Sequence, residues 1–320
     1  MKRHFSRFAF GILSLYFCAV SVFARELIPV GQLVGLELSA GTVTVAAFDD
    51  ALAAARNAGL QVGDRIISID DTTIQSAEDI RQALKHSDGQ VDMVISRDGQ
   101  QRQIHITPEI TASGPKLGVF LKQGITGIGT VTFYDPETGV FGTLGHGVND
   151  GKGQLLSMEK GNVYPASIVS VQKGKSGDPG QLRGSLNGSQ PLGKLSCNTA
   201  QGVFGRCSGI WRGKAITVAS PEEVRTGSAT IRSTVTDGPP REYSVEILKI
   251  YPTSRTDGRN LLIRITDPAL LEITGGIVQG MSGSPIIQDG KLVGAVTHVL
   301  VNDPTRGYGI FIENMLNAAG

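Results

Sequence analysis

Ser282 lies in the short Gly-rich segment GMSGSP, which separates two apolar, strand-like runs. A serine hydroxyl becomes a nucleophile when a base takes its proton, a third group orients that base, and backbone N–H groups receive the oxyanion. Gly280 frees the backbone, so that its N–H and that of Ser282 can converge on one point. Gly283 leaves the far side of the hydroxyl uncluttered. The segment therefore indicates acyl transfer at Ser282, and Ser284 is expected to be structural.

The base is expected to be His146, which follows an apolar strand in the segment FGTLGHGVND. Gly145 and Gly147 flank it, and there is little reason to expose the backbone of a merely solvated histidine in this way. His298 falls on the strand after the nucleophile, where it is expected to line the substrate cleft.

The third group should be a carboxylate that orients the base and stabilises its charged form. Asp267 ends the apolar strand of LLIRITDPALLE, directly before a proline. An aspartate in that position is often only a turn former. Asp178, Asp237 and Asp257 stand in turn-like settings too, and the residue pattern alone does not rank the four.

The elements that position these residues are predicted to be mainly strands. Glycine accounts for 42 of the 320 residues and falls mostly between runs rich in Val, Ile and Thr, which is typical of short strands joined by tight turns. From 119 to 320, helical periodicity is almost absent until the C-terminal segment GYGIFIENMLNA. We expect an all-β barrel or sandwich domain over 119–320.

Residues 27–110 have a different pattern. The segment AGLQVGDRIISIDDTTI precedes an amphipathic helix over SAEDIRQALKH, with Ser76 as N-cap and Asp79 at N3. A hairpin around Asp98-Gly99 follows. This order resembles a PDZ domain, an α+β fold that binds a peptide as an added strand and holds its carboxylate in a backbone loop.

The peptide-binding loop of this domain is expected at Val34, Gly35 and Leu36, which match the apolar-Gly-apolar pattern. The glycine would let backbone N–H groups approach the ligand. The segment TASGPKLG, over 111–118, is expected to be a linker to the second domain.

The first 24 residues are typical of an export signal. Basic residues precede an apolar run from Phe8 to Phe23, and Val22-Phe23-Ala24 offers a cleavage site. A retained membrane anchor is the alternative, and either reading associates the N-terminus with a membrane and places the bulk of the chain outside the cytoplasm.

Composition excludes several other classes of function. A net charge of +1 gives no sign of a nucleic-acid partner. No Cys/His cluster has metal-ligand spacing, and acyl transfer needs no cofactor. Cys197 and Cys207 bracket a possible hairpin; export permits a disulfide between them, but two buried free thiols are favoured.

Two resemblances sharpen these expectations. G-M-S-G-S-P followed by IIQDGKLVGAVTHV has the layout of chymotrypsin-like serine proteases, where the strand after the nucleophile pairs with substrate. The segments GTLGHGVND and NLLIRITDPALLEITGGIVQGMSGSPIIQDGKLVGAVTHVLVNDPTRGYGIFIENML, with the preceding PDZ pattern, resemble the stage IV sporulation protein B peptidases of spore-forming bacteria. That family implies a PDZ domain followed by a chymotrypsin-like double β-barrel.

By this resemblance His146, Asp267 and Ser282 form the catalytic triad. Asp267 lies only 15 residues before the serine, which departs from trypsin-like spacing, so it would have to reach His146 from the second half of the domain. The resemblance also implies a biology. Such peptidases are exported into the space between the forespore and mother-cell membranes, where they cleave themselves. They then cleave a membrane-bound regulator of an intramembrane metalloprotease, so that a late sigma factor is processed. The PDZ domain serves self-recognition and substrate recruitment.

Two other classes of function stay open. One is a non-catalytic adaptor, in which a PDZ domain accompanies an inactive protease-like β domain. The other is an extracytoplasmic quality-control protease, although those usually place the PDZ domain after the protease domain.

Overall fold

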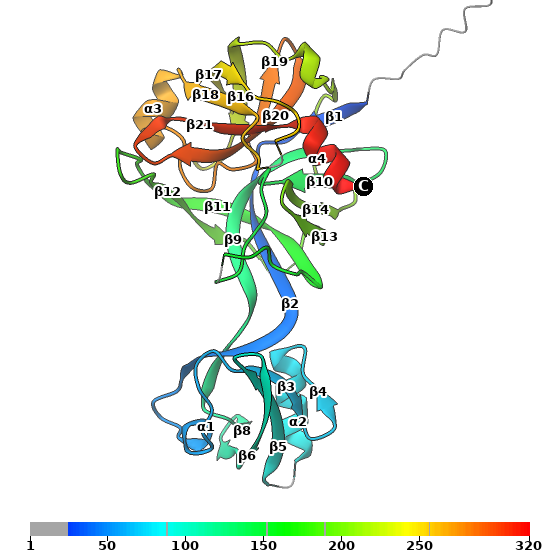
Figure 1. The fold of residues 1–320 in the computed structure, drawn as a ribbon, viewed down its shortest axis with the longest axis vertical. Coiled ribbons are helices and arrows are strands. Elements are labelled where there is room, and N and C mark those ends of the chain that lie inside the picture. Colours follow the sequence, from blue (N-terminus) through cyan, green and yellow to red (C-terminus); the bar gives the residue numbers. More distant parts are fainter. Residues whose placement is uncertain (1–24, 88, 152, 189, 256) are drawn as a thin grey trace, which may run out of the picture.

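The computed structural model describes residues 25–320 except 88, 152, 189 and 256. The predicted export signal, residues 1–24, lies outside the described residues. No helix in the described part of the chain is long and apolar enough to cross a bilayer. The chain forms an upper lobe of two barrels and a smaller lower lobe, joined by two long strands (Figure 1).

The first barrel closes through non-local pairing. Its strands pair in the circuit β9-β10-β14-β13-β11-β2, and β2 pairs back with β9. Short β1 extends this sheet beside β9, and β12 pairs with β11. The bounds are β1 (Glu26–Pro29), β2 (Leu33–Phe48), β9 (Val119–Tyr134), β10 (Val140–Thr143), β11 (Lys160–Gln172), β12 (Gln181–Leu186), β13 (Gly193–Thr199) and β14 (Gly202–Arg206).

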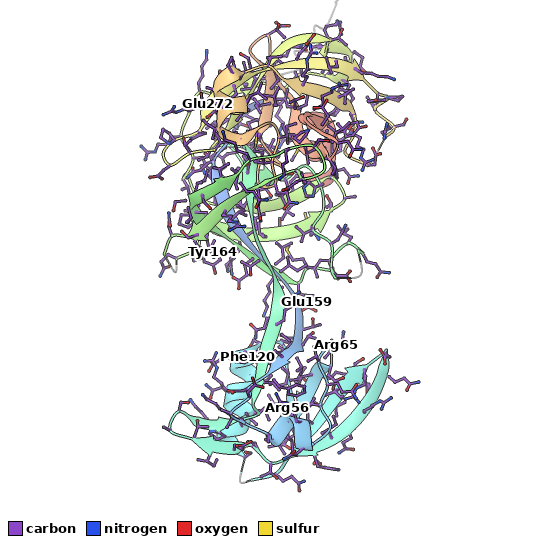
Figure 2. The ribbon with its side chains drawn as sticks, turned by 90° about the vertical axis from the view of Figure 1, so that its left-hand side faces the viewer. Arg56, Arg65, Phe120, Glu159, Tyr164 and Glu272 are labelled. Atoms are coloured by element: carbon purple, nitrogen blue, oxygen red, sulfur yellow. The ribbon has the colours of Figure 1, made fainter. Side chains whose placement is uncertain are left out.

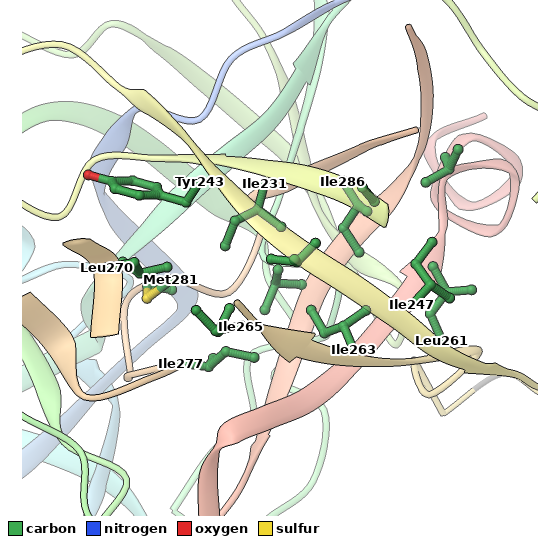
Figure 3. Close-up of a cluster of buried hydrophobic side chains, with 14 of the residues drawn as sticks. Ile231, Tyr243, Ile247, Leu261, Ile263, Ile265, Leu270, Ile277, Met281 and Ile286 are labelled. Atoms are coloured by element: carbon green, nitrogen blue, oxygen red, sulfur yellow. The ribbon is translucent and has the colours of Figure 1, made fainter. Parts of the chain in front are cut away.

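The second barrel is closed in the order β16-β17-β18-β21-β20-β19. Alternating residues of β17, Tyr243, Val245 and Ile247, point into its core, as period-2 patterning requires (Figure 3). The elements of this part are β15 (Ile216–Thr217), the 3-10 helix η1 (Pro221–Glu223), β16 (Gly227–Ser233), β17 (Arg241–Ile250), β18 (Leu261–Ile265), α3 (Pro268–Thr274), β19 (Pro285–Gln288), β20 (Lys291–Leu300), β21 (Asp303–Phe311) and α4 (Ile312–Ala319).

The lower lobe, residues 43–121, is called the PDZ lobe below. Its helix α2 begins with the predicted capping box of Ser76 and Asp79. The predicted hairpin turn has positive φ at both Asp98 and Gly99. Its elements are α1 (Ala54–Asn57), β3 (Arg65–Ile69), β4 (Thr72–Thr73), α2 (Ala77–His86), β5 (Val91–Arg97), β6 (Gln100–Ile106), β7 (Glu109–Thr111) and β8 (Gly114–Lys116).

The structure corrects the domain boundaries that the sequence suggests. Residues 27–38 do not belong to the PDZ lobe, because β1 and the first half of β2 pair within the first barrel. The expected linker, 111–118, is part of the PDZ lobe: it includes β8, and Leu117 is buried in that core. The PDZ lobe is therefore inserted between β2 and β9 of the first barrel. Figure 2 shows Phe120 near the lower end of β9, where the strand leaves this lobe.

Cys197 and Cys207 are both free thiols, as favoured from the sequence. Cys197 pairs with Phe204 in the β13–β14 hairpin, so the two cysteines do not face each other across it. Burial raises the pKa of the Cys207 thiol to about 11, which makes it a poor nucleophile at neutral pH.

Candidate active site

The Ser282 loop connects α3 to β19 and is held from two sides. Gly280 and Gly283 adopt φ values of 99° and 95°, which favour glycine. Strand β9 of the first barrel binds the loop, because Thr130 N–H donates to Ser282 O at 3.1 Å and Thr130 Oγ1 donates to Gly280 O at 2.8 Å. The nucleophile of the second barrel is thus fixed by the first barrel.

No side chain fits at Gly283. A Cβ there would lie 2.1 Å from Thr130 O and 2.5 Å from Leu144 N, both backbone atoms. Ser284 is fully buried; its hydroxyl donates to Met281 O at 2.7 Å and lies 2.9 Å from the Ser233 hydroxyl, which can donate to it. Ser284 therefore holds the loop, and Ser282 is the serine that faces the cavity.

Two backbone donors beside Ser282 are free. In the described part of the chain, no hydrogen bond uses the N–H of Gly280 or of Ser282, although the neighbouring N–H groups of Met281, Gly283 and Ser284 all donate to carbonyls. Unpaired N–H groups on either side of a nucleophile are what an oxyanion hole requires.

The loop that carries His146 packs against the second barrel. Gly145 has a φ of 69°, and a Cβ at this position would lie 2.8 Å from Thr297 Cγ2. Leu144 before it also has positive φ, 67°, a strained conformation for a leucine that its buried side chain helps to hold. A Cβ at Gly147 would lie 2.7 Å from Thr199 O. The glycines around His146 thus serve close packing of the loop.

The imidazole of His146 is oriented by its own neighbour. Nδ1 lies 2.9 Å from Gly147 O, and a carbonyl only accepts, so Nδ1 carries the proton and Nε2 is left as the basic nitrogen. Burial lowers the pKa of His146, so the ring is neutral at neutral pH and able to take a proton.

His298 lies against His146, with ring centroids 5.3 Å apart. Its Nδ1 is buried without a hydrogen-bond partner in the described structure. Burial, then the proximity of His146 and Arg259, lowers the pKa of His298 to about 4, so this ring is neutral at physiological pH. His298 contacts His146 but is not among the residues that line the cavity of Ser282, so its predicted place in the substrate cleft stays a prediction.

His146 and Ser282 line one cavity of about 310 Å³. Its other walls are mostly apolar and come from β2, β9 and the His146 and Ser282 loops: Leu36, Leu38, Ile125, Gly127, Ile128, Leu144, Gly147, Val148, Asn149, Gln279 and Gly280. Ser282 Oγ donates to Thr297 O at 2.8 Å, and no hydrogen bond joins it to His146 among the described residues.

Asp267 does not lie beside His146 in this structure. It is the N-cap of α3, where Leu270 N–H donates to Oδ1 at 3.0 Å and Ser244 N–H to Oδ2 at 3.2 Å. No hydrogen bond or ion pair joins it to His146 within the described chain. The physical reason is the sequence Asp-Pro at a strand end, which favours a helix start. The expected triad contact is absent from this arrangement.

Of the other carboxylates considered, Asp257 is the one with an electrostatic effect on the histidine pair. It raises the pKa of His298, against the larger lowering by burial, and its oxygens bind Arg255. Asp178 caps the turn at Gly180 and binds Gln172, away from His146. Asp237 is exposed in a turn.

Sequence reasoning missed Asn198, which braces the segment after His146. Its side chain accepts from Val148 N–H at 2.9 Å and donates to Val148 O at 2.8 Å and Leu156 O at 2.9 Å. These hydrogen bonds fix Val148, which lines the cavity beside His146. The segment CNTAQG gave no signal, because the partners are backbone groups distant in sequence.

Val34, Gly35 and Leu36 do not form a peptide-binding loop. They lie in the first barrel, where they pair with β9 and β11. A Cβ at Gly35 would lie 1.8 Å from Leu186 Cδ2, so this glycine serves packing under β12.

A second segment has the same apolar-Gly-apolar pattern and lies in the PDZ lobe. Leu117, Gly118 and Val119 lead into β9, and Gly118 has a φ of 74°. They line a cavity of about 240 Å³ beside α2. The signal was present in the sequence as KLGVF, which begins inside the segment that reads as a linker and runs two residues past it.

Comparison with known proteins agrees with this architecture. The profile described as SpoIVB peptidase S55 matches residues 114–316, more than half of the chain, and a PDZ domain profile matches 53–97. The chain belongs to the SpoIVB peptidase S55 family. It is a serine peptidase with a PDZ domain, and the mainly β fold predicted from the sequence is confirmed.

Solved structures similar to the S55 peptidase include two of the Rv3671c protease from M. tuberculosis H37Rv, both in the inactive form. The first is 15% identical, covers 60% of this chain and 84% of that chain, and has a TM-score of 0.35. The second, a serine-to-alanine mutant, is 14% identical, covers 60% and 82%, and has a TM-score of 0.34. None of the curated proteins matches the sequence.

Proposed function

We propose that Ser282 and His146 are the nucleophile and base of this S55 peptidase. Nε2 of His146 removes the proton as Ser282 Oγ attacks the peptide carbonyl, and the N–H groups of Gly280 and Ser282 hold the oxyanion. His146 then protonates the leaving amine, and water releases the acyl group. Gly147 O fixes the tautomer of His146, a task that a carboxylate has in trypsin-like sites.

One observation carries this proposal. The two unpaired N–H groups, the Ser282 hydroxyl and the neutral imidazole of His146 belong to one loop cluster around one apolar cavity. Backbone donors without a protein partner in a binding cavity are available to a ligand, and pairing with one recovers the hydrogen bonds that they lack. A developing oxyanion is the ligand that suits them.

We further propose that the enzyme acts in sporulation signalling, as the family name suggests. It would be exported to the space between forespore and mother-cell membranes and associate with a membrane through its N-terminus. It would cleave itself there and then cleave a membrane-bound regulator of an intramembrane metalloprotease. The PDZ lobe would recruit these substrates, which include the enzyme itself.

A fluorophosphonate probe tests the chemical part, because it labels only an activated serine. The wild-type enzyme should be labelled and should cleave itself, and Ser282→Ala should abolish both. Ser284→Ala is the matched control. It removes a hydroxyl that holds the loop and leaves the nucleophile in place, so Ser282 should still be labelled. An unlabelled wild-type protein, or labelling that survives in Ser282→Ala, would refute the nucleophile assignment and favour a non-catalytic adaptor.

The signalling part needs a separate test in a sporulating host. Replacement of the host's own S55 peptidase by this chain should restore late sigma-factor processing, and replacement by Ser282→Ala should not. Processing that is restored equally by both proteins would contradict the proposed role.

A further inference from the structure

Two hollows lie on one strand, β9. At its start, Val119, Phe120 and Leu121 line the cavity of about 240 Å³ in the PDZ lobe, opposite Ile80 and Leu84 of α2. Farther along, Ile125, Gly127 and Ile128 line the cavity of about 310 Å³ that contains Ser282 and His146. Strand β9 thus connects the PDZ lobe with the upper lobe (Figure 1), and it carries residues of both cavities.

One edge of β9 is open between these hollows. From Val119 to Ile128 the strand pairs with β2, and within the described residues no strand pairs with its other edge until β10 reaches Val131. Gly127 is exposed, and a Cβ there would meet nothing within 4 Å. An unpaired edge offers N–H and C=O groups to an incoming strand, and this is how PDZ domains take their ligands.

The direction of such a strand follows from the loop that precedes β9. If Leu117, Gly118 and Val119 hold a C-terminal carboxylate, the ligand must run away from the loop along β9, antiparallel to it. Residues nearer the N-terminus of the ligand therefore lie progressively closer to Ile128 and to Ser282.

The substrate is expected to run in the same direction where it passes the nucleophile. Ser282 Oγ points to Thr297 O on β20, the strand expected to pair with substrate, and we assign to it the substrate residues before the scissile bond. No residue of β20 lines the 310 Å³ cavity. That cavity therefore lies on the other side of Ser282, where the residues after the scissile bond belong, and these residues lead toward the C-terminus.

We propose that this peptidase measures its cleavage site from a free C-terminus. The substrate tail is bound as one extended strand along β9, with its carboxylate at Gly118 and its scissile bond at Ser282. Val119 and Ile128 are nine residues apart on β9, at about 3.3 Å per residue, so about nine or ten substrate residues follow the scissile bond. The inference rests on the proposed function of Ser282.

The walls define the substrate class. The groove beside α2 presents Ile80, Leu84, Leu117, Val119 and Leu121, so the terminal residue of the tail is apolar. The cavity beside Ser282 presents Leu36, Leu38 and Ile125, so an apolar residue also follows the scissile bond. Water is added across that amide, which leaves a new carboxylate on the protein and releases a short C-terminal peptide with a free amine.

A series of quenched fluorescent peptides tests the proposal with the whole enzyme. Each peptide carries the same cleavable segment and the same apolar C-terminal residue, and Gly/Ser spacers set the distance between them from about four to about sixteen residues. We expect kcat/KM to be highest near nine or ten residues, and about tenfold lower at both extremes or when the C-terminus is amidated.

Two variants locate the effect. Ala77→Trp fills the groove beside α2, and should reduce cleavage of the optimal peptide to the level of its amidated form. Gln82→Trp, on the exposed side of the same helix, is the control and should keep the wild-type profile. The amidated peptides test the same point without any change to the enzyme.

Equal cleavage of all the peptides would overturn the measured-distance proposal alone. So would the absence of cleavage at every spacing by an enzyme that the fluorophosphonate labels. Failure of the probe to label Ser282 would overturn the proposed function and this inference with it.

Discussion

His298 should make the stability of the enzyme depend on pH. Its folded-state pKa is about 4, below the ordinary value of 6.5, chiefly because of burial. A depressed pKa means that the unfolded chain binds the proton more readily. The contribution of His298 is therefore fully present above pH 6.5 and is lost as the pH falls toward 4.

The size of the effect follows from the two pKa values. One proton of difference changes the free energy of unfolding by about 1.4 kcal/mol per pH unit, so about 2 kcal/mol is lost between about pH 7 and about pH 5. His298→Gln cannot titrate in this range. We therefore expect the variant to lose about 2 kcal/mol less than the wild type over this interval.

Urea denaturation at both pH values measures this difference, with far-UV circular dichroism and the fluorescence of Trp211, the single tryptophan, which is buried in the first barrel. Gln101→Ala, on exposed β6 of the PDZ lobe, removes no titrating group, so it is the control and should follow the wild type. The reasoning is refuted if His298→Gln and the wild type lose the same free energy, or if the ring resonances of His298 titrate above pH 6 in NMR spectra.

Three further predictions concern the site. Asp267→Ala should lower the free energy of unfolding by about 1 to 2 kcal/mol in urea denaturation, because both carboxylate oxygens accept backbone N–H groups, and Asp267→Ser should recover most of it; a folded Asp267→Ser enzyme without turnover would instead support the triad role. Because burial lowers the pKa of His146, the acid limb of a kcat/KM profile should have its midpoint below pH 6.5, and a midpoint above that value would contradict its assignment as base. Gly283→Ala should abolish labelling and reduce the melting temperature, since its Cβ would meet Thr130 O at 2.1 Å, whereas Gly151→Ala, with open space around it, should do neither.

The nucleophile and base could be predicted from sequence because their signals are local. Gly283 permits one tight loop, and Gly145 permits another. The glycines that each loop needs therefore lie within a few residues of Ser282 and His146 in the sequence. The capping box at Ser76 and the turn at Asp98 are local in the same sense, and the structure has both.

The errors arose where pairing is non-local. The segments QLVGLELS and TVTVAAFD both fall within the predicted first domain, 27–110, but they form one strand, β2, that passes from the first barrel into the PDZ lobe. Gly35 and Gly118 have similar neighbours, and only the partners of β2 and β9 show that Gly118 faces α2. Asp267 shows the same limit, since its Asp-Pro pattern fits a helix cap as well as a catalytic carboxylate.

The insertion of the PDZ lobe between β2 and β9 also bears on how the chain folds. Leu33 pairs with Thr130 in the first barrel. If the chain between these two residues were a flexible loop, its length would make this contact slow to form. Phe48 pairs with Val119 at the edge of the PDZ lobe, so folding of that lobe brings the two strands together and replaces the long loop with a short one. We therefore expect the PDZ lobe to form first and to speed closure of the first barrel. The active site would then form last, after β9 has been placed beside β2.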